Sequence, residues 1–185
     1  MNEFSDPKEA ASWLKSGKIL IHPTEGVWGL GCDAFNLKAC QKINSLKKRE
    51  NQKNFIILVP TILAALKCFE SISDEQGIFL NKIWPGHTTV IHHANKEIPS
   101  TLKALDNTIA VRVSNHLSLL NLLTTTKKPM VSTSANITKV PTPDALVDVI
   151  KYFHDPDVAV YAHSNGSAKK PSAIVRLQTL EYIRE

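Results

Sequence analysis

A cluster of basic residues lies about a quarter of the way along the chain, and its chemistry suits phosphate. Lys47, Lys48 and Arg49 follow one another, and Lys53 comes shortly after them. Arginine offers phosphate oxygens a planar fork of donors, whereas lysine offers a point charge. The cluster therefore predicts a clamp for the triphosphate of a nucleotide. Cations are also favourable at the C-terminus of a helix, so a purely structural role stays open.

A second cluster, the segment 132–136, reads Ser-Thr-Ser-Ala-Asn and directly follows the apolar run Met130-Val131. If that run begins a strand, Ser132 and Ser134 share one face near its C-terminal end. Open α/β sheets bind ligands at the C-terminal ends of their strands. We therefore expect these hydroxyl groups to face a ligand, although such residues are also common in turns.

Arg112 is a charged residue in an otherwise apolar strand. The segment 108–113 alternates, with three branched apolar side chains on one face and Thr108, Ala110 and Arg112 on the other. A charge in such a strand needs a partner of opposite sign. The pattern therefore predicts either an anionic ligand or an ion pair with an aspartate or glutamate.

The segment 23–31 reads Pro-Thr-Glu-Gly-Val-Trp-Gly-Leu-Gly, and its three glycines would let a ligand approach the backbone closely. It matches neither GxGxxG nor GxxxxGK[ST], so neither phosphate-loop motif applies. No metal site is expected, because the adjacent His92 and His93 would point to opposite faces of a strand. HExxH and GxSxG are absent from the sequence.

Alternating strands and helices must position these clusters, which predicts an α/β fold whose sheet is covered by helices. We expect helices over 5–16, 37–46, 60–69, 74–84, 116–125 and 144–152. Strands are expected over 18–22, 55–59, 88–93, 108–113, 130–134, 158–161 and 173–177. The sequence contains no repeat and no linker that would divide it, so residues 1–185 are predicted to form a single domain.

The composition is that of a globular protein, with 43% hydrophobic and 21% charged residues and a formal net charge of +5. This charge favours anionic partners such as nucleotides or nucleic acid. No apolar run is long enough to span a membrane, and the first residues lack the pattern of a secretory signal. Cys32, Cys40 and Cys68 form no CxxC pair, so we expect small apolar roles for them in a reducing cytoplasm.

Five motifs, taken together, resemble the YrdC/TsaC family, the threonylcarbamoyl-AMP synthases. They are PTEGVWGLG at 23–31, KKR at 47–49, WPGHTT at 84–89, TIAVRVSNH at 108–116 and VSTSAN at 131–136. Their order and spacing follow the family's pattern from about residue 7 to 185, in its short, single-domain form. The resemblance implies a twisted, open mixed sheet flanked by helices, the YrdC-like fold, with a concave basic face.

The resemblance also implies a reaction. L-Threonine and bicarbonate form a carbamate, whose oxygen attacks the α-phosphorus of ATP; threonylcarbamoyl-adenylate and pyrophosphate result. A downstream complex then transfers the threonylcarbamoyl group to adenosine 37 of tRNAs that read codons beginning with A. Mg²⁺ is expected to accompany ATP, with no tightly bound cofactor, and contact with tRNA is possible.

Site residues follow by the same resemblance. Lys47, Arg49, Ser134 and Asn136 are expected to be catalytic. ATP is expected to contact a set drawn from the whole chain: Lys47, Arg49, Lys53, Thr108, Ser134, Asn136, Thr142 and Arg184. Threonine or bicarbonate is expected at Arg112, Ser132 and Ser172.

The sequence departs from the family pattern at several places. Gly26 stands where relatives often have Thr, Ser or Ala, and Trp28 replaces Tyr or Phe. Glu50 and Asn54 replace prolines after the basic motif, and His87 replaces the second proline of WPGP. These changes are expected to alter substrate affinity more than identity.

Two other functions were weighed. A non-catalytic module that binds double-stranded RNA or tRNA would use the basic face and depend steeply on salt. The modest net charge and the aromatic fraction of 6% disfavour it. An enzyme that moves carbamoyl groups to other acceptors, as in hydrogenase maturation, is disfavoured by the short chain.

Overall fold

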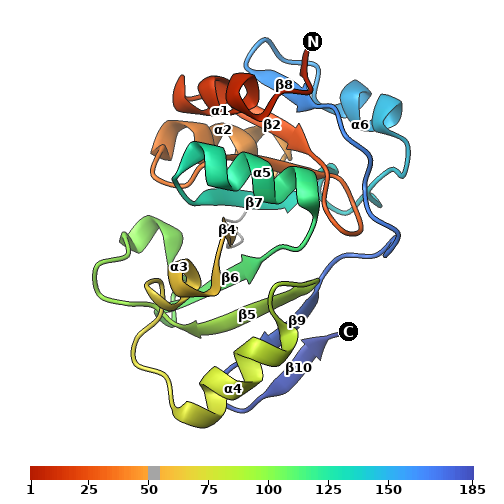
Figure 1. Cartoon of the computed structure of the whole chain (residues 1–185). Helices are drawn as coiled ribbons and strands as arrows, with labels where there is room; N and C mark the ends of the chain where they lie inside the picture. The colour runs from red at the N-terminus through yellow and green to blue at the C-terminus, as the bar shows by residue number, and fades with distance from the viewer. Residues whose placement is uncertain (50–54) are drawn as a thin grey trace.

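The computed structural model describes residues 1–49 and 55–185. Strands from along these residues form one ten-stranded sheet. The strand order is β1-β8-β2-β3-β7-β4-β6-β5-β9-β10, with parallel and antiparallel neighbours. Figure 1 shows β2, β7 and β8 at one end of the molecule and β5, β9 and β10 at the other. The predicted open, mixed α/β sheet is thus confirmed.

The strands are short and mostly coincide with the apolar runs of the sequence. Their bounds are β1 Asn2–Phe4, β2 Ile19–His22, β3 Gly29–Asp33, β4 Ile56–Val59, β5 Thr88–His93, β6 Thr108–Val113, β7 Met130–Ser134, β8 Val158–Tyr161, β9 Ala173–Arg176 and β10 Glu181–Arg184. Strands β1, β3 and β10 were not predicted. β3 was missed because its glycines, Gly29 and Gly31, are unusual in a buried strand. β1 and β10 are edge strands, and all four residues of β10 are exposed, so the sequence has no buried apolar signal there.

The helices begin at polar caps. Their bounds are α1 Pro7–Lys15, α2 Leu37–Leu46, α3 Ile62–Leu66, α4 Asp74–Ile83, α5 Leu117–Thr126 and α6 Leu146–Tyr152, with a short 3₁₀ turn at Ser100–Leu102. Asp6 caps α1, because its carboxylate accepts from the backbone N–H of Lys8, so the helix begins two residues later than predicted. Ser73 and Gln76 form a capping box at the start of α4.

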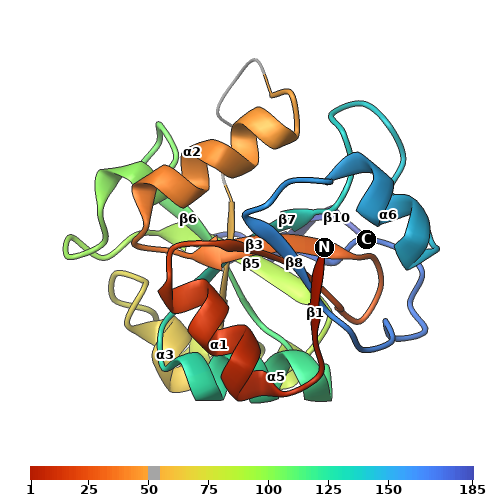
Figure 2. The same ribbon diagram turned by 90° about the horizontal axis from the view of Figure 1, so that it is seen from above.

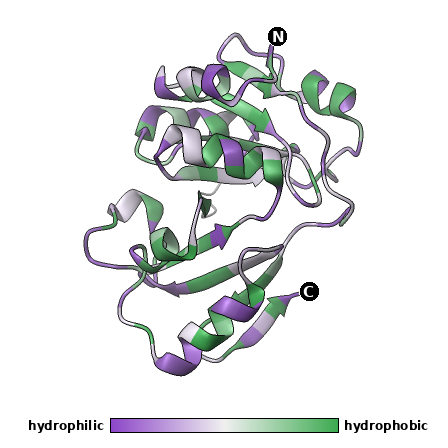
Figure 3. Cartoon of the chain, in the orientation of Figure 1, coloured by the Kyte–Doolittle hydropathy of each residue, from purple (hydrophilic) through white to green (hydrophobic). Residues whose placement is uncertain are grey.

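Two apolar layers hold the helices on the sheet. α1 and α5 pack on one face through a cluster that includes Leu14, Leu20 and Leu122. α2 packs on the other face through Cys40 and Ile43. Figure 2 shows α2 on one side of the sheet and α1 with α5 on the other. Hydrophilic and hydrophobic residues alternate along α1 and α4, as amphipathic helices require (Figure 3).

The middle of the sheet brings together the segments that the sequence singled out. β7 lies between β3 and β4, and β6 lies beside β4. Ser132 of β7 is opposite Gly31 on one side and Ile56 on the other, and Ile56 is opposite Ala110 of β6. Because partners in register point to the same face, Ser132 and Arg112 share a face of the sheet.

Among the described residues, no helix combines the length and apolar character that crossing a membrane requires. All three cysteines are buried and carry free thiols. Cys32 and Cys40 lie together in the apolar layer beneath α2, with their Sγ atoms 3.7 Å apart. They serve as small core residues, as predicted.

Candidate functional site

A pocket of about 450 Å³ opens over the middle of the sheet. Strands β5, β6, β7 and β9, the end of α2 and the last strand all contribute to it. Most of its polar lining comes from Thr24, Lys47, Arg49, His87, Thr89, Thr108, Arg112, Ser132, Thr133, Ser134, Asn136, Thr138, Lys139, Ser172 and Arg184. The segments 47–49 and 132–136, distant in sequence, therefore line the same cavity.

Lys47 is the C-cap residue of α2, and its side chain is buried against the turn that follows β7. Its Nζ donates to the carbonyl oxygens of Ser134 and Asn136, the latter at 2.6 Å, and to Oδ1 of Asn136 at 3.1 Å. Three acceptors match the three N–H donors of an ammonium. The lysine thus fastens the end of α2 to the segment after β7.

Burial lowers the pKa of Lys47 to about 7, and the nearby positive charge of Arg49 adds to this effect. A negative charge brought close would favour the ammonium and raise the pKa again. An anionic ligand would therefore stabilise the charged form of Lys47, because the protein alone compensates this charge poorly.

Arg49, the last residue of the basic motif, contacts strand β7. One of its terminal nitrogens donates to Oγ1 of Thr133 at 2.5 Å, and its guanidinium lies 5.7 Å from the centre of the Phe55 ring. Burial lowers its pKa. The stacking and the hydrogen bond hold the charged fork at the wall of the pocket.

Ser134 and Asn136 are joined to each other. The Ser134 hydroxyl donates to Oδ1 of Asn136 at 2.6 Å. The Asn136 amide nitrogen in turn donates to the carbonyl oxygens of Val140 and Ile137, at 2.5 Å and 3.1 Å. This network closes the turn after β7 and fixes the acceptors around Lys47.

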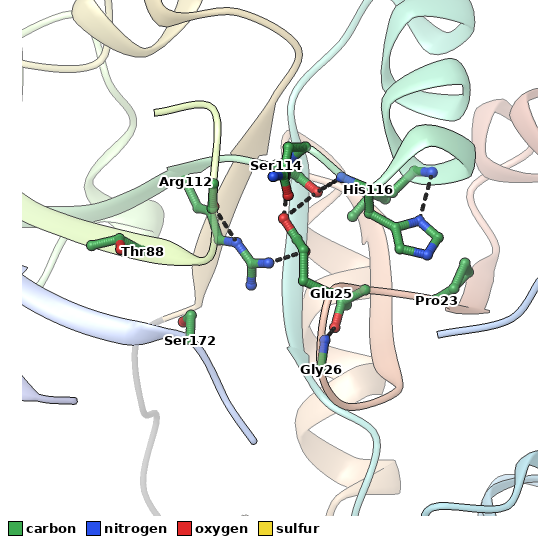
Figure 4. Close-up of polar contacts among 12 residues, drawn as sticks. Pro23, Glu25, Gly26, Thr88, Arg112, Ser114, His116 and Ser172 are labelled. Carbon is green, nitrogen blue, oxygen red and sulfur yellow. Dashed lines mark hydrogen bonds and ion pairs between the residues drawn. The ribbon is translucent and has the colours of Figure 1, made fainter. Parts of the chain in front are cut away.

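Arg112 makes a buried ion pair with Glu25, so the structural partner left open by the sequence is present (Figure 4). Its Nε donates to the carbonyl oxygen of Gly86 at 3.3 Å. The other carboxylate oxygen of Glu25 accepts from the Ser114 hydroxyl at 2.9 Å and from the backbone N–H of Asn115 at 3.0 Å. Arg112 lines the pocket as a neutralised rather than an isolated charge.

The last strand supplies the far wall. Arg184 donates from Nε and a terminal nitrogen to the carbonyl oxygen of Ser172, at 2.9 Å and 2.6 Å. The Ser172 hydroxyl and that of Thr89 are 2.8 Å apart. A guanidinium has five N–H donors, more than this carbonyl uses. Ser172 and Arg184 both line the pocket.

The remaining predicted residues differ in placement. Thr108 lines the pocket, but its hydroxyl donates to Asp106 at 2.7 Å. Thr142 is not among the described residues that line the pocket. Thr142 is expected there only through the resemblance to the family. Lys53 lies outside the described residues, as do Glu50 and Asn54.

Two departures from the family pattern lie against each other. A Cβ added at Gly26 would come within 3.0 Å of Cε1 of His87 and within 2.0 Å of the carbonyl oxygen of Lys170. Gly26 therefore leaves the space that the imidazole of His87 occupies. Trp28 lines the pocket, and its Nε1 donates to the carbonyl oxygen of Asp144 at 3.0 Å.

Sequence reasoning missed two charged residues of this region. Glu25 had no assigned role, although it is an acidic residue within a glycine-rich apolar segment, which is a signal of a buried partner. Lys139 lines the pocket beside Thr138 and adds a further cation. Its position in a polar turn after the 132–136 cluster was the available clue.

Comparisons with known proteins agree over nearly the whole chain. The family model Sua5_yciO_yrdC, described as "Telomere recombination", matches residues 12–185. A protein from Pseudomonas fluorescens named threonylcarbamoyl-AMP synthase is 32% identical over 96% of this chain and 95% of its own length. One of the same name from Acinetobacter baumannii is 35% identical over 95% of this chain and 96% of its own length.

Solved structures share the fold. E. coli YciO superposes with a TM-score of 0.84 at 21% identity, over all of this chain and 93% of that one. Sua5 from P. abyssi, in a crystal structure complexed with L-threonine, has a TM-score of 0.81 at 24% identity. It matches 93% of this chain, which spans only about half (51%) of the Sua5 chain.

Proposed function

The chain belongs to the Sua5–YciO–YrdC family, and on that premise we propose that it synthesises L-threonylcarbamoyl-adenylate from L-threonine, bicarbonate and ATP. One observation carries the proposal. The basic motif 47–49 and the segment 132–136 line one pocket, in a chain that matches proteins named threonylcarbamoyl-AMP synthase over 95% of their length. The same relatives do not favour a non-catalytic RNA-binding module.

The reaction joins two anions. The threonine nitrogen adds to the carbon of bicarbonate and water leaves, which gives a carbamate. A carbamate oxygen then forms a bond to the α-phosphorus of ATP while the bond to the bridging oxygen breaks and pyrophosphate departs. Repulsion between carbamate and triphosphate must be offset by positive groups that are already in place.

The lining of the pocket meets that need. Lys47, Arg49, Lys139 and Arg184 reach it from three separate segments. Lys47, Arg49 and Arg184 are each held by an oxygen of the protein, so little reorganisation is required when charge develops at phosphorus. We assign Lys47, Arg49, Ser134 and Asn136 to the reacting phosphates, and retain Lys53, Thr108 and Thr142 as predicted ATP contacts.

The threonine and bicarbonate side of the pocket is assigned to Arg112, Ser132 and Ser172. Arg112 already has Glu25 as its counter-ion, so it contributes a weaker field than an unpaired arginine. We therefore propose that Arg112 orients the carboxylate of a substrate and does not neutralise the triphosphate.

Magnesium enters as part of the nucleotide substrate. The described residues include no group of three or more His, Cys, Asp or Glu side chains that could hold a metal ion, and none of those that line the pocket is a carboxylate. The donor set is therefore unsuited to a resident divalent cation, and the triphosphate oxygens themselves are the ligands for Mg²⁺.

The biological setting follows as part of the proposal. The product would pass to a threonylcarbamoyl-transferase complex for modification of adenosine 37 in tRNAs that read codons beginning with A. Free cysteine thiols fit the reducing cytoplasm, where such tRNAs are modified. We also propose that residues 1–185 act as one domain, because one sheet connects all ten strands.

A steady-state assay tests the proposal. Purified protein with ATP and Mg²⁺ should release pyrophosphate only when both threonine and bicarbonate are present. Omission of either one is the control. Release of pyrophosphate that needs neither, or binding of tRNA with no release under saturating substrates, would contradict the proposed reaction.

A further inference from the structure

His22 reaches across a neighbouring strand beneath the pocket. It is the last residue of β2, it is fully buried, and it is opposite Gly29 of β3. A Cβ added at Gly29 would lie 2.3 Å from Cε1 of His22, and one at Gly31 would lie 3.2 Å from its Nε2. The two glycines therefore leave a channel over β3 that the imidazole fills.

The far end of this channel is Ser132 on β7. Gly31 is opposite Ser132 in the sheet, and Nε2 of His22 is 3.1 Å from the Ser132 hydroxyl oxygen. The histidine thus contacts a residue that lies two strands away from its own. Without side chains at 29 and 31, nothing on β3 separates the two groups.

The direction of this hydrogen bond is determined by the other ring nitrogen. Nδ1 lies 3.1 Å from the carbonyl oxygen of Pro23, which can only accept, so Nδ1 carries a hydrogen. Burial lowers the pKa of His22 to about 4, so the ring is neutral at pH 7 and Nε2 has no hydrogen. The hydroxyl of Ser132 must therefore donate to Nε2.

This direction decides what Ser132 can offer to the pocket that it lines. Its single hydrogen points away toward His22, so its oxygen presents only lone pairs to a ligand. Lone pairs repel phosphate and carboxylate oxygens and attract an N–H or O–H. Ser132 is 7% exposed, so the group that reaches it must be small.

We propose that His22 is a positioning residue that holds Ser132 as a hydrogen-bond acceptor, and that Ser132 receives an N–H or O–H of the amino-acid substrate. The triphosphate has only acceptors to offer, whereas threonine has its α-nitrogen and its hydroxyl as donors. The inference rests on the proposed function, and it assigns Ser132 to a donor group of the amino acid.

Calorimetry of L-threonine binding tests this arrangement. The titration is done in the presence of an ATP analogue that cannot be cleaved at the α-phosphorus. Ser132→Ala and His22→Met should each weaken threonine binding about tenfold, the loss of one hydrogen bond. The double variant should be no weaker than Ser132→Ala alone, because both changes remove the same contact. His22→Gln should keep most of the threonine affinity that His22→Met loses, since the glutamine amide oxygen can accept the hydrogen bond of the Ser132 hydroxyl in place of Nε2.

Two ligand comparisons locate the donor. If the hydroxyl of threonine is bound, 2-aminobutyrate should bind the wild-type protein weakly and be insensitive to Ser132→Ala. If the α-nitrogen is bound, 2-aminobutyrate and threonine should lose affinity equally in that variant. Affinity for the ATP analogue should stay unchanged in every variant.

Other results would overturn the inference. These are additive losses in the double variant, equal losses in His22→Gln and His22→Met, or losses confined to the nucleotide. Should His22→Met fail to fold, the ¹⁵N shifts of His22 in the wild-type protein at pH 7 decide: a hydrogen on Nε2 contradicts the proposal. Failure of the wild-type protein to bind threonine at all would instead contradict the proposed function.

Discussion

Nζ of Lys47 lies 2.6 Å from the carbonyl oxygen of Asn136, so an ammonium joins the end of α2 to the turn after β7. Only 2% of Lys47 is exposed. This one contact joins the basic and hydroxyl-rich motifs, although Lys47 and Asn136 are 89 residues apart in sequence. It also places the Lys47 amine at the pocket before any substrate arrives.

Lys47→Met should reduce catalysis far more than it reduces stability. Loss of one preorganised positive donor costs about 2–4 kcal/mol in the transition state, a decrease in kcat/KM of roughly a hundredfold or more. The free energy of unfolding should change by less than about 2 kcal/mol, because lost hydrogen bonds are offset by relief of a buried charge. Steady-state kinetics and urea unfolding measure the two effects.

Lys48→Met is the matched control for this prediction. Lys48 is the next residue and is exposed, so it should leave both kcat/KM and stability nearly unchanged. Equal activity losses in the two variants would show that only net charge matters. That outcome would contradict a specific role for Lys47.

The buried pair of Arg112 and Glu25 should be needed for folding. Glu25→Ala leaves the guanidinium buried without its counter-ion and also removes the acceptor for Ser114 and Asn115. We expect a loss of about 3–5 kcal/mol in the free energy of unfolding. Lys128→Met, which removes the more exposed pair with Asp33, should have little effect in the same urea titration.

Acid should destabilise the protein through His22. Burial, the largest cause, and the charges of Arg112 and His116 lower its pKa from 6.5 to about 4 in the folded state, against the opposing effects of the Pro23 carbonyl and Glu25. Between these two values the unfolded chain binds more protons than the folded one. Stability should therefore fall by roughly 3 kcal/mol as pH drops from 6.5 to about 4.

His22→Gln isolates that contribution, because the amide does not titrate. Urea unfolding of this variant over the same range of pH should show a shallower loss of stability than the wild type. If the two curves run parallel, folding does not lower the pKa of His22.

Gly26→Ala should displace the segment that carries Lys170 and Ser172, and it should crowd the imidazole of His87. The new Cβ would lie 2.0 Å from the carbonyl oxygen of Lys170, so the backbone of one loop must move. We expect a loss of about 1–3 kcal/mol in stability, with a fall in activity. Gly77→Ala in α4 has space, with its nearest neighbour at 3.8 Å, and should instead stabilise by about 0.5–1 kcal/mol.

Much of the fold follows from local patterns in the sequence. The strands 88–93, 108–113 and 130–134 are predicted with the bounds that the structure shows, because their apolar residues alternate or form continuous runs. The edge strands β1 and β10 have no such pattern. They form because neighbouring strands offer unpaired backbone groups, which is a tertiary effect.

The site was predictable in its parts but not in its contacts. The sequence identified Lys47 and Ser134 as members of one pocket through the resemblance to a family. Two contacts depend on which segments meet across the sheet, and the sequence alone does not show this. They are the burial of Lys47 against backbone carbonyls and the ion pair of Arg112 with Glu25. The sequence explains Gly29 only once His22 is seen to lie over it.

The most direct test of the central claim is mass spectrometry of the product formed with ¹³C-labelled bicarbonate. With ATP, Mg²⁺ and threonine, the account predicts threonylcarbamoyl-adenylate that carries the label, and a strong decrease in its formation by Arg49→Ala. An unlabelled adenylate, or no adenylate from folded wild-type protein with all substrates saturating, would contradict it.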